Sequence, residues 1–504
     1  MNDIKKIFTN GAFIDMGPGS YAAVGVNGKG IITRLFRAHE ELQSSIPAGV
    51  PVIDMHNLWA IPAFEDAHNH LAARARTLFE IDLRGQDISW DAAKERIAER
   101  ARKTPDGGWV VCHGWNEARW GIIGQAELDE MSFTKGIFLI NVSYHGGLVN
   151  MKGISLLAEK GCVIGKTGRV TEGEFESVTI ATSPDMEGYV KAIPQLQERL
   201  LSLGVGAVHD MHILTLEQLA VYRRLDARGL LKLPTVLYIN PRLLGFKKEI
   251  ADYIHASGGM ARLAGLKLFL DGAIGTSTAS VHGGYADHTG TGILRHTQEE
   301  CVEYVQQAVE IGLEQVSMHC IGDKAVDQAV AIFTALRREY AGKIKVWRFE
   351  HFEMPSDAAI QAVASHGGIA SMQPNFSWDA ENYRTRLGAR VATINPLRKV
   401  LDAGAVLAFG SDDVPSGPIE GIRWAATKAP YEMQRLTIPE ALRAYTEAPA
   451  IAAGSPERRG KMAVGYEANF TVLDRDPLQK ESWTDEANGI AVKEVWLRGE
   501  KRFG

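Results

Sequence analysis

The segment Asp66-Ala67-His68-Asn69-His70 carries two histidines whose spacing suits a metal ion. It follows the apolar run Leu58–Phe64, which predicts a buried strand. Residues two positions apart on a strand point to the same side, so His68 and His70 can bind one ion. Imidazole is a common ligand of zinc and other borderline metals. Taken alone, the pair is weak evidence for a metal site, and two ordinary polar histidines are the favoured alternative.

Four further polar side chains stand inside or at the end of other apolar runs. Lys267 lies within the run Leu266–Asp271, and His319, His351 and Asp412 each end a run of their own. The active sites of parallel barrels lie at the carboxyl ends of the strands. If these runs are the strands of such a barrel, five separate segments deliver polar groups to one place.

Short apolar runs alternate with amphipathic stretches through the middle of the chain, which is typical of parallel βα architecture. Helices are expected at Glu299–Glu310, Ala325–Glu339 and Asp357–Ser365. Eight runs are expected to be strands: Ile61–Asp66, Val205–Asp210, Leu233–Ile239, Leu263–Asp271, Glu314–His319, Lys345–His351, Gly368–Gln373 and Ala405–Ser411. We therefore expect an α/β chain whose main unit is a (β/α)8 TIM barrel.

The two ends of the chain are rich in β signals. The pairs Asn10-Gly11 and Asn27-Gly28 separate β-prone runs near the start, and each predicts a hairpin turn. Asn469–Leu473 and Val492–Leu497 predict strands near the end. We expect residues 1–60 and 455–504 to form one small β-sandwich domain, and two independent β appendages are the alternative.

The connection between the first and second predicted strands is too long for one helix. It contains predicted strands at Trp109–His113 and Ile137–Val142 and a charged helix at Trp90–Lys103. We expect residues 76–184 to be an insertion that caps the barrel mouth, with a helix at Gly188–Leu203 leading back. The barrel would then comprise residues 61–75 and 185–454.

Composition narrows the class of protein. The 504 residues are 45% hydrophobic and 23% charged, with a formal net charge of −6, which is ordinary for a globular enzyme. The chain has no basic block that would favour nucleic acid and no apolar run long enough to span a membrane. Its four cysteines lack CxxC spacing and its first residues lack the core of a signal peptide. We expect a cytoplasmic enzyme with a small-molecule substrate; a homodimer stays open.

Several motifs together resemble one family. They are DAHNHL, LKLFLDGAIG, HCIGDKAVD, RFEHFEM, SMQP, FGSDD and GKMAVGYEANFTVLDRDP. The chain resembles the amidohydrolase superfamily and, within it, the YtcJ-like amidohydrolase family 3 branch that includes N-substituted formamide deformylases. The match runs from near residue 1 to residue 504. It departs from the family pattern at Ala63, Glu65 and Asn469, where glycine, valine or isoleucine, and aspartate are usual.

The resemblance implies a centre of two divalent ions, with zinc as the default. His68, His70 and Asp412 would bind the more buried ion, and His319 and His351 the other. Lys267 would bridge both as a carbamate formed with carbon dioxide. A desolvated lysine near cations has a lowered pKa, so its free amine can react in this way. A salt-bridged core lysine is the alternative.

A centre of this kind suits hydrolysis of a small-molecule carbon–nitrogen amide bond, of N-formyl or N-acyl type, by a metal-bridging hydroxide. Asp412 would take the proton of the attacking water and pass it to the leaving amine. We prefer Asp412 to Asp413 because the matching motif is Gly-Ser-Asp.

Other residues are expected to contact the substrate. His145 and Asn150 resemble the GHxxxxN segment of the branch and could bond to the substrate carbonyl; a polar loop contact is the alternative. His145 is therefore a second catalytic candidate. The remaining candidates for binding the substrate or orienting the site are Trp115, Asp271, Phe376 and Trp378.

Three other functions compete. An esterase or lactonase could use the same binuclear site. A deaminase of the superfamily would use one metal and carry a glutamate three residues after the strand-five histidine, where Gly322 stands here. A catalytically silent scaffold would have lost some of the ligand residues, all of which are present.

Overall fold

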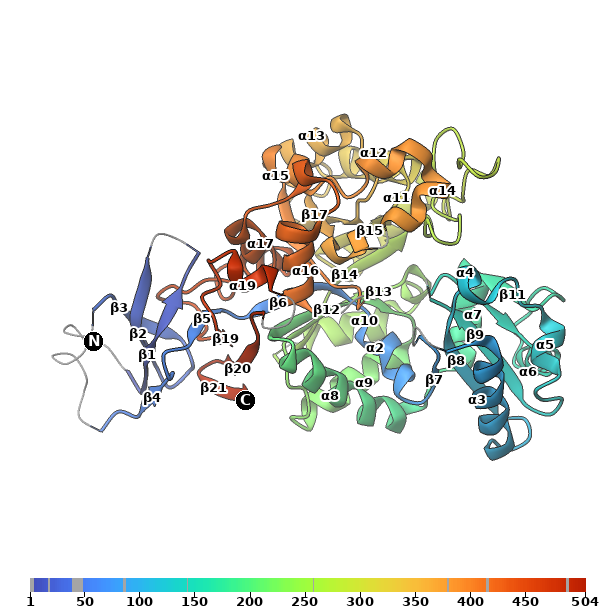
Figure 1. Ribbon diagram of the computed structural model, residues 1–504, viewed down its shortest axis with the longest axis horizontal. Helices are drawn as coiled ribbons and strands as arrows, with labels where there is room; N and C mark the ends of the chain where they lie inside the picture. The colour runs from blue at the N-terminus through green and yellow to red at the C-terminus, as the bar shows by residue number, and fades with distance from the viewer. Residues whose placement is uncertain are drawn as a thin grey trace.

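The computed structural model describes residues 4–16, 19–38, 49–84, 88–142, 144–256, 258–378, 380–413, 417–485 and 489–504, apart from the side chains of Ala118 and Trp378. A barrel occupies the middle of the molecule (Figure 1). The sheet built from the two chain ends lies on one side of the barrel and the insertion on the other.

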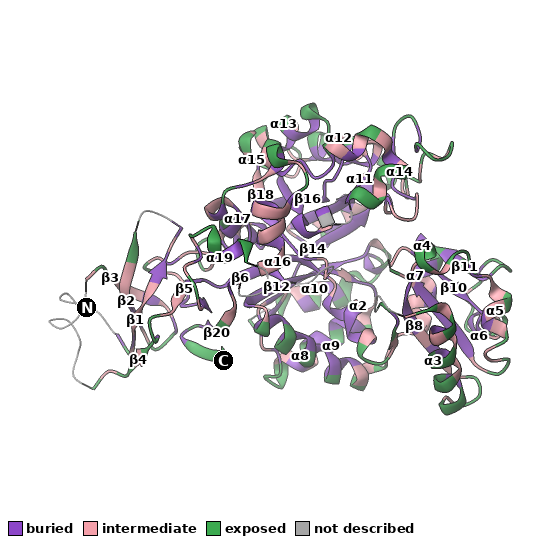
Figure 2. Cartoon of the chain, in the orientation of Figure 1, coloured by how far each residue is buried: buried purple, intermediate pink, exposed green. Residues whose placement is uncertain are grey.

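Eight parallel strands make the barrel, and each is hydrogen-bonded to the next one in sequence. Nearly all their residues are buried (Figure 2), as expected for strands covered by helices on the outside. Asp412 N donates to His68 O across 2.8 Å, which links the ends of the last and first strands. The predicted TIM barrel is confirmed. Its strands are β6 Phe64–Asn69, β12 Val205–Ile213, β13 Thr235–Ile239, β14 Ala261–Phe269, β15 Gln315–Cys320, β16 Val346–His351, β17 Ile369–Met372 and β18 Val406–Phe409.

The first strand begins later than expected. Residues 59–62 belong to β5 (Trp59–Pro62), a strand of the terminal sheet, and the barrel strand starts at Phe64. The apolar run Leu58–Phe64 is thus shared between two sheets. The shift leaves His68 and His70 at the carboxyl end of the strand, as predicted.

Helices cover the outside of the barrel, and several begin at side-chain caps. Thr215, Thr297 and Ser356 each accept a hydrogen bond from the backbone three residues on, which stabilises the first turn. The helix predicted at Asp357–Ser365 is confirmed with the same bounds. The helices are α2 Leu71–Ala75, α8 Met186–Ser202, α9 Leu216–Ala227, α10 Lys247–His255, α11 Gln298–Ile311, α12 Asp323–Leu336, α13 Asp357–Ser365, α14 Arg384–Leu387, α15 Leu397–Asp402, α16 Pro418–Arg423, α17 Ile438–Ala444 and α18 Glu447–Ala452.

Both chain ends enter one sheet, because β5 pairs antiparallel with β19. The rings of Phe470 and Trp496 meet the ring of Phe8 edge to face, with centroids 5.3 Å and 5.0 Å away, so the two ends also share a core. Two independent appendages are therefore excluded. The strands are β1 Lys6–Ile14, β2 Ser20–Val26, β3 Ile32–Phe36, β4 Val52–Asp54, β5, β19 Phe470–Leu473, β20 Val492–Leu497 and β21 Glu500–Phe503.

One of the two predicted hairpin turns is wrong. Strand β1 continues through Asn10-Gly11 and carries a register shift there, with Asn10 at φ 55°. A β-bulge has replaced the turn. A Cβ at Gly11 would lie 2.7 Å from Met55 Cβ, so the segment that follows β4 can pack this closely only against a glycine. The turn at Asn27-Gly28 is confirmed: Gly30 N donates to Asn27 O across 3.0 Å.

The insertion is a five-stranded sheet flanked by helices (Figure 1). Its charged helix has the predicted bounds Trp90–Lys103. The strands are β7 Ile81–Asp82, β8 Trp109–Trp115, β9 Gly136–Asn141, β10 Gly146–Val149 and β11 Arg169–Thr171; the helices are α3 Trp90–Lys103, α4 Glu117–Trp120, α5 Gln125–Asp129, α6 Met151–Glu159 and α7 Glu172–Ala181.

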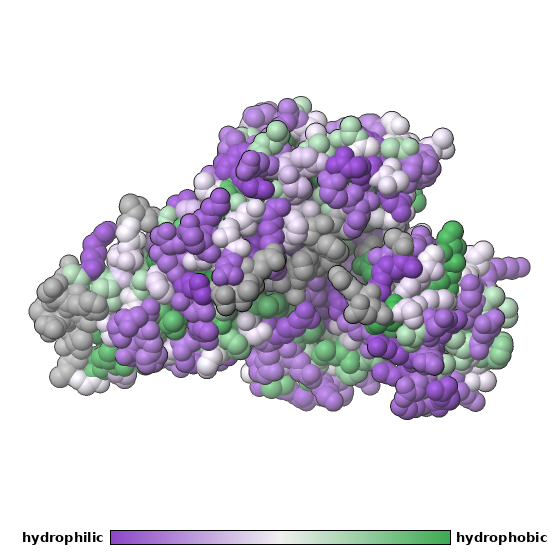
Figure 3. Space-filling model, in the orientation of Figure 1, coloured by the Kyte–Doolittle hydropathy of each residue, from purple (hydrophilic) through white to green (hydrophobic). Residues whose placement is uncertain are grey.

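The outer surface is mostly polar on the face shown in Figure 3. In the part of the chain that the structure describes, no helix combines the length and apolar character that a membrane span requires.

Candidate metal centre

His68, His70 and Asp412 meet at the carboxyl end of the barrel. One ligand atom from each lies within 4.8 Å of the others. His70 Nε2 is 3.1 Å from Asp412 Oδ1, and these two side chains are 19% and 20% exposed, whereas that of His68 is fully buried. Burial alone would raise the pKa of Asp412, but His70 and His68 hold this pKa below its ordinary range, so the carboxylate is charged.

The backbone at the ends of two strands is bent to aim these side chains. Asp412 and Asp413 have φ values of 47° and 60°, and His351 and Phe352 have 67° and 48°. Left-handed backbone at a non-glycine residue costs on the order of 1–3 kcal/mol and is concentrated at functional sites. The bend after β18 directs Asp412 towards His70, while Asp413 Oδ2 lies 3.3 Å from Arg74 Nε.

His319 and His351 extend the cluster. The ring centroids of His68 and His351 are 4.7 Å apart, and those of His351 and His319 are 4.4 Å apart. The Nε2 of His319 donates to Gly272 O (3.0 Å), and the Nδ1 of His351 donates to Gln373 Oε1 (2.7 Å). Each ring is thus held through one nitrogen, which leaves the other for an ion. This is the usual arrangement of metal-binding histidines.

Lys267 lies on β14 beside these rings. Its side chain is fully buried, and Nζ has no hydrogen-bond partner among the described residues. Nζ lies 4.8 Å from the centroid of the Phe269 ring. Burial lowers the pKa of Lys267 to about 8. The alternative of a salt-bridged core lysine has no support here, because no carboxylate of the described chain is within ion-pair distance.

Sequence reasoning missed Glu350, the carboxylate behind His68. The Nδ1 of His68 lies 2.6 Å from Glu350 Oε2, and both side chains are fully buried. Glu350 Oε1 accepts from Arg348 Nε (2.7 Å) and from Ser317 Oγ (2.8 Å). Arg348 and His68 hold the pKa of Glu350 well below its ordinary range against the opposing effect of burial. The contact places the His68 proton on Nδ1 and leaves Nε2 for a metal.

A signal for Glu350 was present in the sequence. Arg348 and Glu350 stand two positions apart on a strand whose other residues before His351 are apolar, so both point to the same side of it. A charged residue is almost never fully buried without a partner. Two such residues on one face of a buried strand therefore predict an ion pair. Because Glu350 directly precedes the predicted ligand His351, this pair is expected next to the metal centre.

The polar contacts continue through the barrel away from the centre. Arg348 Nη1 donates to His209 Nδ1 (2.7 Å), and His209 Nε2 donates to Glu65 Oε1 (2.9 Å). Arg459 Nη2 donates to the same oxygen across 2.8 Å. Glu65 is one of the departures from the family pattern, and the structure shows it paired on both sides within the barrel core.

His145 reaches the centre from the insertion. Its ring centroid is 5.5 Å from that of His319, and its Nδ1 lies 3.3 Å from both carboxylate oxygens of Glu172. Burial would lower the pKa of His145, but Glu172 outweighs this and raises the pKa. Arg295 pairs with two glutamates of the insertion: Nη1 lies 3.5 Å from Glu172 Oε2, and Nη2 lies 2.6 Å from Glu176 Oε1. These ion pairs join the insertion to the barrel.

The side chains of the centre fit metal ions. Four nitrogens are buried and lack a hydrogen-bond partner within the described residues: His68 Nε2, His70 Nδ1, Lys267 Nζ and His319 Nδ1. Each buried polar atom left unpaired costs about 1–3 kcal/mol. Nitrogen and carboxylate ligands of this kind suit zinc and similar divalent metals.

Comparison with known proteins agrees with this geometry. A family model described as "Amidohydrolase family" matches residues 51–503. The chain belongs to the amidohydrolase family. The predicted resemblance is confirmed, and the protein is a metal-dependent hydrolase of this family.

Individual relatives align over most of the chain. It is 26% identical to the N-substituted formamide deformylase of Arthrobacter pascens, over 100% of this chain and 98% of that protein. It is 25% identical to YtcJ of Bacillus subtilis, over 84% of this chain and 85% of that protein. The crystal structure of an uncharacterized metal-dependent hydrolase from Pyrococcus horikoshii has a TM-score of 0.79 at 26% identity, and covers 94% of this chain and 98% of that one.

Two residues of this amidohydrolase that were expected to contact substrate, Asn150 and Trp115, are packed inside the insertion instead. The third residue, Asp271, was expected to orient a ligand; its Oδ1 lies 3.5 Å from His319 Nε2, and that role stays a prediction. Asn150 is fully buried and caps α6; its amide makes four hydrogen bonds to backbone groups of the insertion, so none remains for a substrate. Trp115 is 2% exposed within the core of the insertion. Asp271 accepts from the backbone amides of Ser280, Ile321 and Gly322, and burial raises its pKa to about 7.

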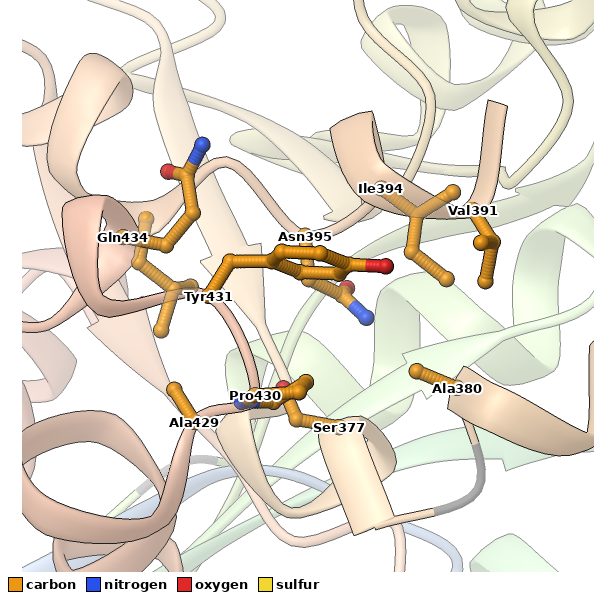
Figure 4. A pocket seen from close by; sticks show the side chains of 10 residues that line it. Ser377, Ala380, Val391, Ile394, Asn395, Ala429, Pro430, Tyr431 and Gln434 are labelled. Atoms are coloured by element: carbon orange, nitrogen blue, oxygen red, sulfur yellow. The ribbon is translucent and has the colours of Figure 1, made fainter. Parts of the chain in front are cut away.

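Phe376, a predicted substrate-binding residue, lies beside the proposed ligand His351. Its ring stacks on His351 with centroids 6.0 Å apart and planes 8° apart. The side chain of Trp378 lies outside the described part of the chain. Close to Phe376, Ser377 and Tyr431 border a hollow of about 10 Å³ (Figure 4), which has room for about one water molecule. The hollow is therefore too small to be the substrate pocket.

Proposed function

We propose that this protein hydrolyses a carbon–nitrogen amide bond of N-formyl or N-acyl type in a small molecule. The observation that carries the proposal is the cluster of buried ligand nitrogens without hydrogen-bond partners in the described barrel, beside the charged carboxylate of Asp412. The relative named N-substituted formamide deformylase, aligned over the whole chain, supports the amide class.

Two divalent ions, with zinc as the default, would be held by six side chains. His68, His70 and Asp412 would hold one, His319 and His351 the other, and Lys267 would reach both after its amine has added carbon dioxide and released a proton. When bound, the ions would activate water and polarise the substrate carbonyl. The lowered pKa of Lys267 supports carbamate formation, because more of the amine is then neutral.

Asp412 and His145 would handle the proton and the developing charge. Asp412 is ionised and partly exposed, so its carboxylate can accept a proton from water and deliver it to the leaving nitrogen. Glu172 contacts His145 and raises the pKa of His145. The imidazolium form is therefore favoured, and it can donate a hydrogen bond to the carbonyl oxygen. Asp413 has no such role, since its carboxylate pairs with Arg74.

The packing at Gly322 argues against a deaminase. In that class a glutamate would occupy this position. A Cβ at Gly322 would overlap Ser280 O. The backbone amide of Gly322 also donates a hydrogen bond to Asp271, which fixes the position of this residue. A larger residue would have to displace the backbone that follows β14. The site is therefore built without room for the deaminase acid.

The test is a panel of formanilide, acetanilide, N-acetyl amino acids and phenyl acetate, assayed after reconstitution with zinc, manganese or cobalt. We expect amides to be cleaved and metal analysis to find two ions per chain. Cleavage of the ester alone would favour the esterase alternative. An Asp412→Asn variant with bound metal controls for contaminating hydrolases. A fully metallated protein that cleaves no amide would contradict the proposal.

A further inference from the structure

A histidine outside the proposed ligand set lies at the same end of the barrel. His212 is on β12, and its ring centroid is 5.9 Å from that of His70 and 4.6 Å from that of Phe269. The ring centroid of Phe269 is in turn 5.1 Å from that of His319. His212 therefore stands beside His70, a proposed ligand of one ion, and the Phe269 ring lies next to both His212 and His319, a proposed ligand of the other. None of the family motifs includes His212.

Asn240 determines which nitrogen of His212 carries the proton. Asn240 Oδ1 accepts a hydrogen bond from Arg242 N (3.1 Å), which sets the orientation of the amide. The Nδ2 of Asn240 then faces His212 Nε2 across 3.3 Å. An amide NH₂ group can only donate, so Nε2 accepts, and the neutral imidazole carries its proton on Nδ1.

The Nδ1–H group of His212 is available to a ligand. It has no hydrogen-bond partner within the described residues, and it is not among the enclosed unpaired atoms of the centre. The residue is partly exposed, as are His70, His145, Phe376 and Asp412, whereas His68, Lys267 and His319 are buried. His212 therefore has surface that a ligand can contact, as do the other partly exposed residues of the centre.

We propose that His212 is a substrate-binding residue that donates Nδ1–H to an oxygen acceptor of the substrate, and that Asn240 is the residue that positions it. This inference rests on the proposed amide hydrolysis. The acceptor is either the scissile carbonyl oxygen or a second oxygen on the substrate. A neutral hydrogen bond of this kind corresponds to roughly a tenfold effect on kcat/KM.

Four variants test the inference on the panel above: His212→Phe, His212→Asn, Asn240→Leu and the control His255→Phe, which alters an exposed histidine of α10. We expect His212→Phe to lower kcat/KM about tenfold at wild-type metal content. His212→Asn keeps an N–H donor and should recover much of the loss. A fall in kcat for every amide would identify the scissile carbonyl, and a rise in KM confined to substrates with a second oxygen would identify the other acceptor.

A second readout does not require turnover. In protein labelled with ¹⁵N-histidine, the signal that disappears in His212→Phe should report a protonated Nδ1 and an unprotonated Nε2, and Asn240→Leu should abolish that preference. Wild-type kcat/KM in His212→Phe, activity lost in step with metal, or a proton on Nε2 would each overturn the inference. Failure of the proposed function would look different, because the wild-type protein itself would then cleave no amide.

Discussion

Replacing Glu350 by glutamine removes one negative charge from the centre of the barrel and leaves its shape intact. Glu350 is fully buried and accepts from Arg348 Nε (2.7 Å), Arg348 Nη2 (3.2 Å) and Ser317 Oγ, besides its contact with His68. A glutamine offers one oxygen and one NH₂ group in the same place. All the partners of Glu350 donate to it, so the NH₂ group of the glutamine must face at least one other hydrogen-bond donor.

The size of the effect follows from burial. Arg348 has no exposed surface, and its other acceptors (His209, Tyr238, Ala67 and Ser371) are uncharged. Leaving one partner of a buried ion pair uncompensated costs about 3–5 kcal/mol. Loss of a carboxylate behind a metal-binding histidine typically lowers metal affinity 10- to 100-fold. We therefore expect Glu350→Gln to lower Tm by several degrees and to weaken metal binding at least tenfold.

Two comparisons separate the loss of stability from the loss of metal affinity. Adding Arg348→Met should restore part of the Tm, because the guanidinium is no longer left without its carboxylate partner, while metal affinity should stay low. Glu440→Gln makes the same substitution at the partly exposed pair with Arg398, and should cost about 1 kcal/mol or less without changing metal affinity. The measurements are thermal unfolding of the metal-free protein and competitive zinc titration. Wild-type zinc affinity in Glu350→Gln would refute the positioning role.

Further expectations concern the proposed ligands and proton carriers. Removing metal with a chelator should abolish hydrolysis and lower Tm, and zinc should restore both; activity in verified metal-free protein would contradict metal dependence. Asp412→Asn should lower kcat at least about 100-fold and Asp413→Asn much less, as steady-state kinetics will show; the reverse order would exchange their roles. Lys267→Ala and Lys267→Arg should both lose bound metal by elemental analysis, since neither can form a carbamate; full metal content in either would remove Lys267 from the centre. His145→Ala should lower kcat about 100-fold at normal metal content, and unchanged kcat would make it a loop residue.

The sequence by itself determined the barrel and the candidates for its metal centre. Most barrel strands consist largely of apolar residues, because they are covered on both faces, and His68, His319, His351 and Asp412 stand at or near carboxyl ends, which border the site. The HxH spacing depends only on the alternation of side chains along one strand. Such signals are local, so they survive without knowledge of the rest of the fold.

Tertiary structure decided the roles that depend on contacts between distant segments. Glu350 meets His68 across 282 positions of sequence, and Asn240 meets His212 across 28. Asn150 matched a substrate-binding motif, yet every hydrogen-bonding group of its amide is used by the backbone of the insertion. A residue type states which hydrogen bonds a side chain can make, whereas its neighbours in space decide which of them are left for a metal or a substrate.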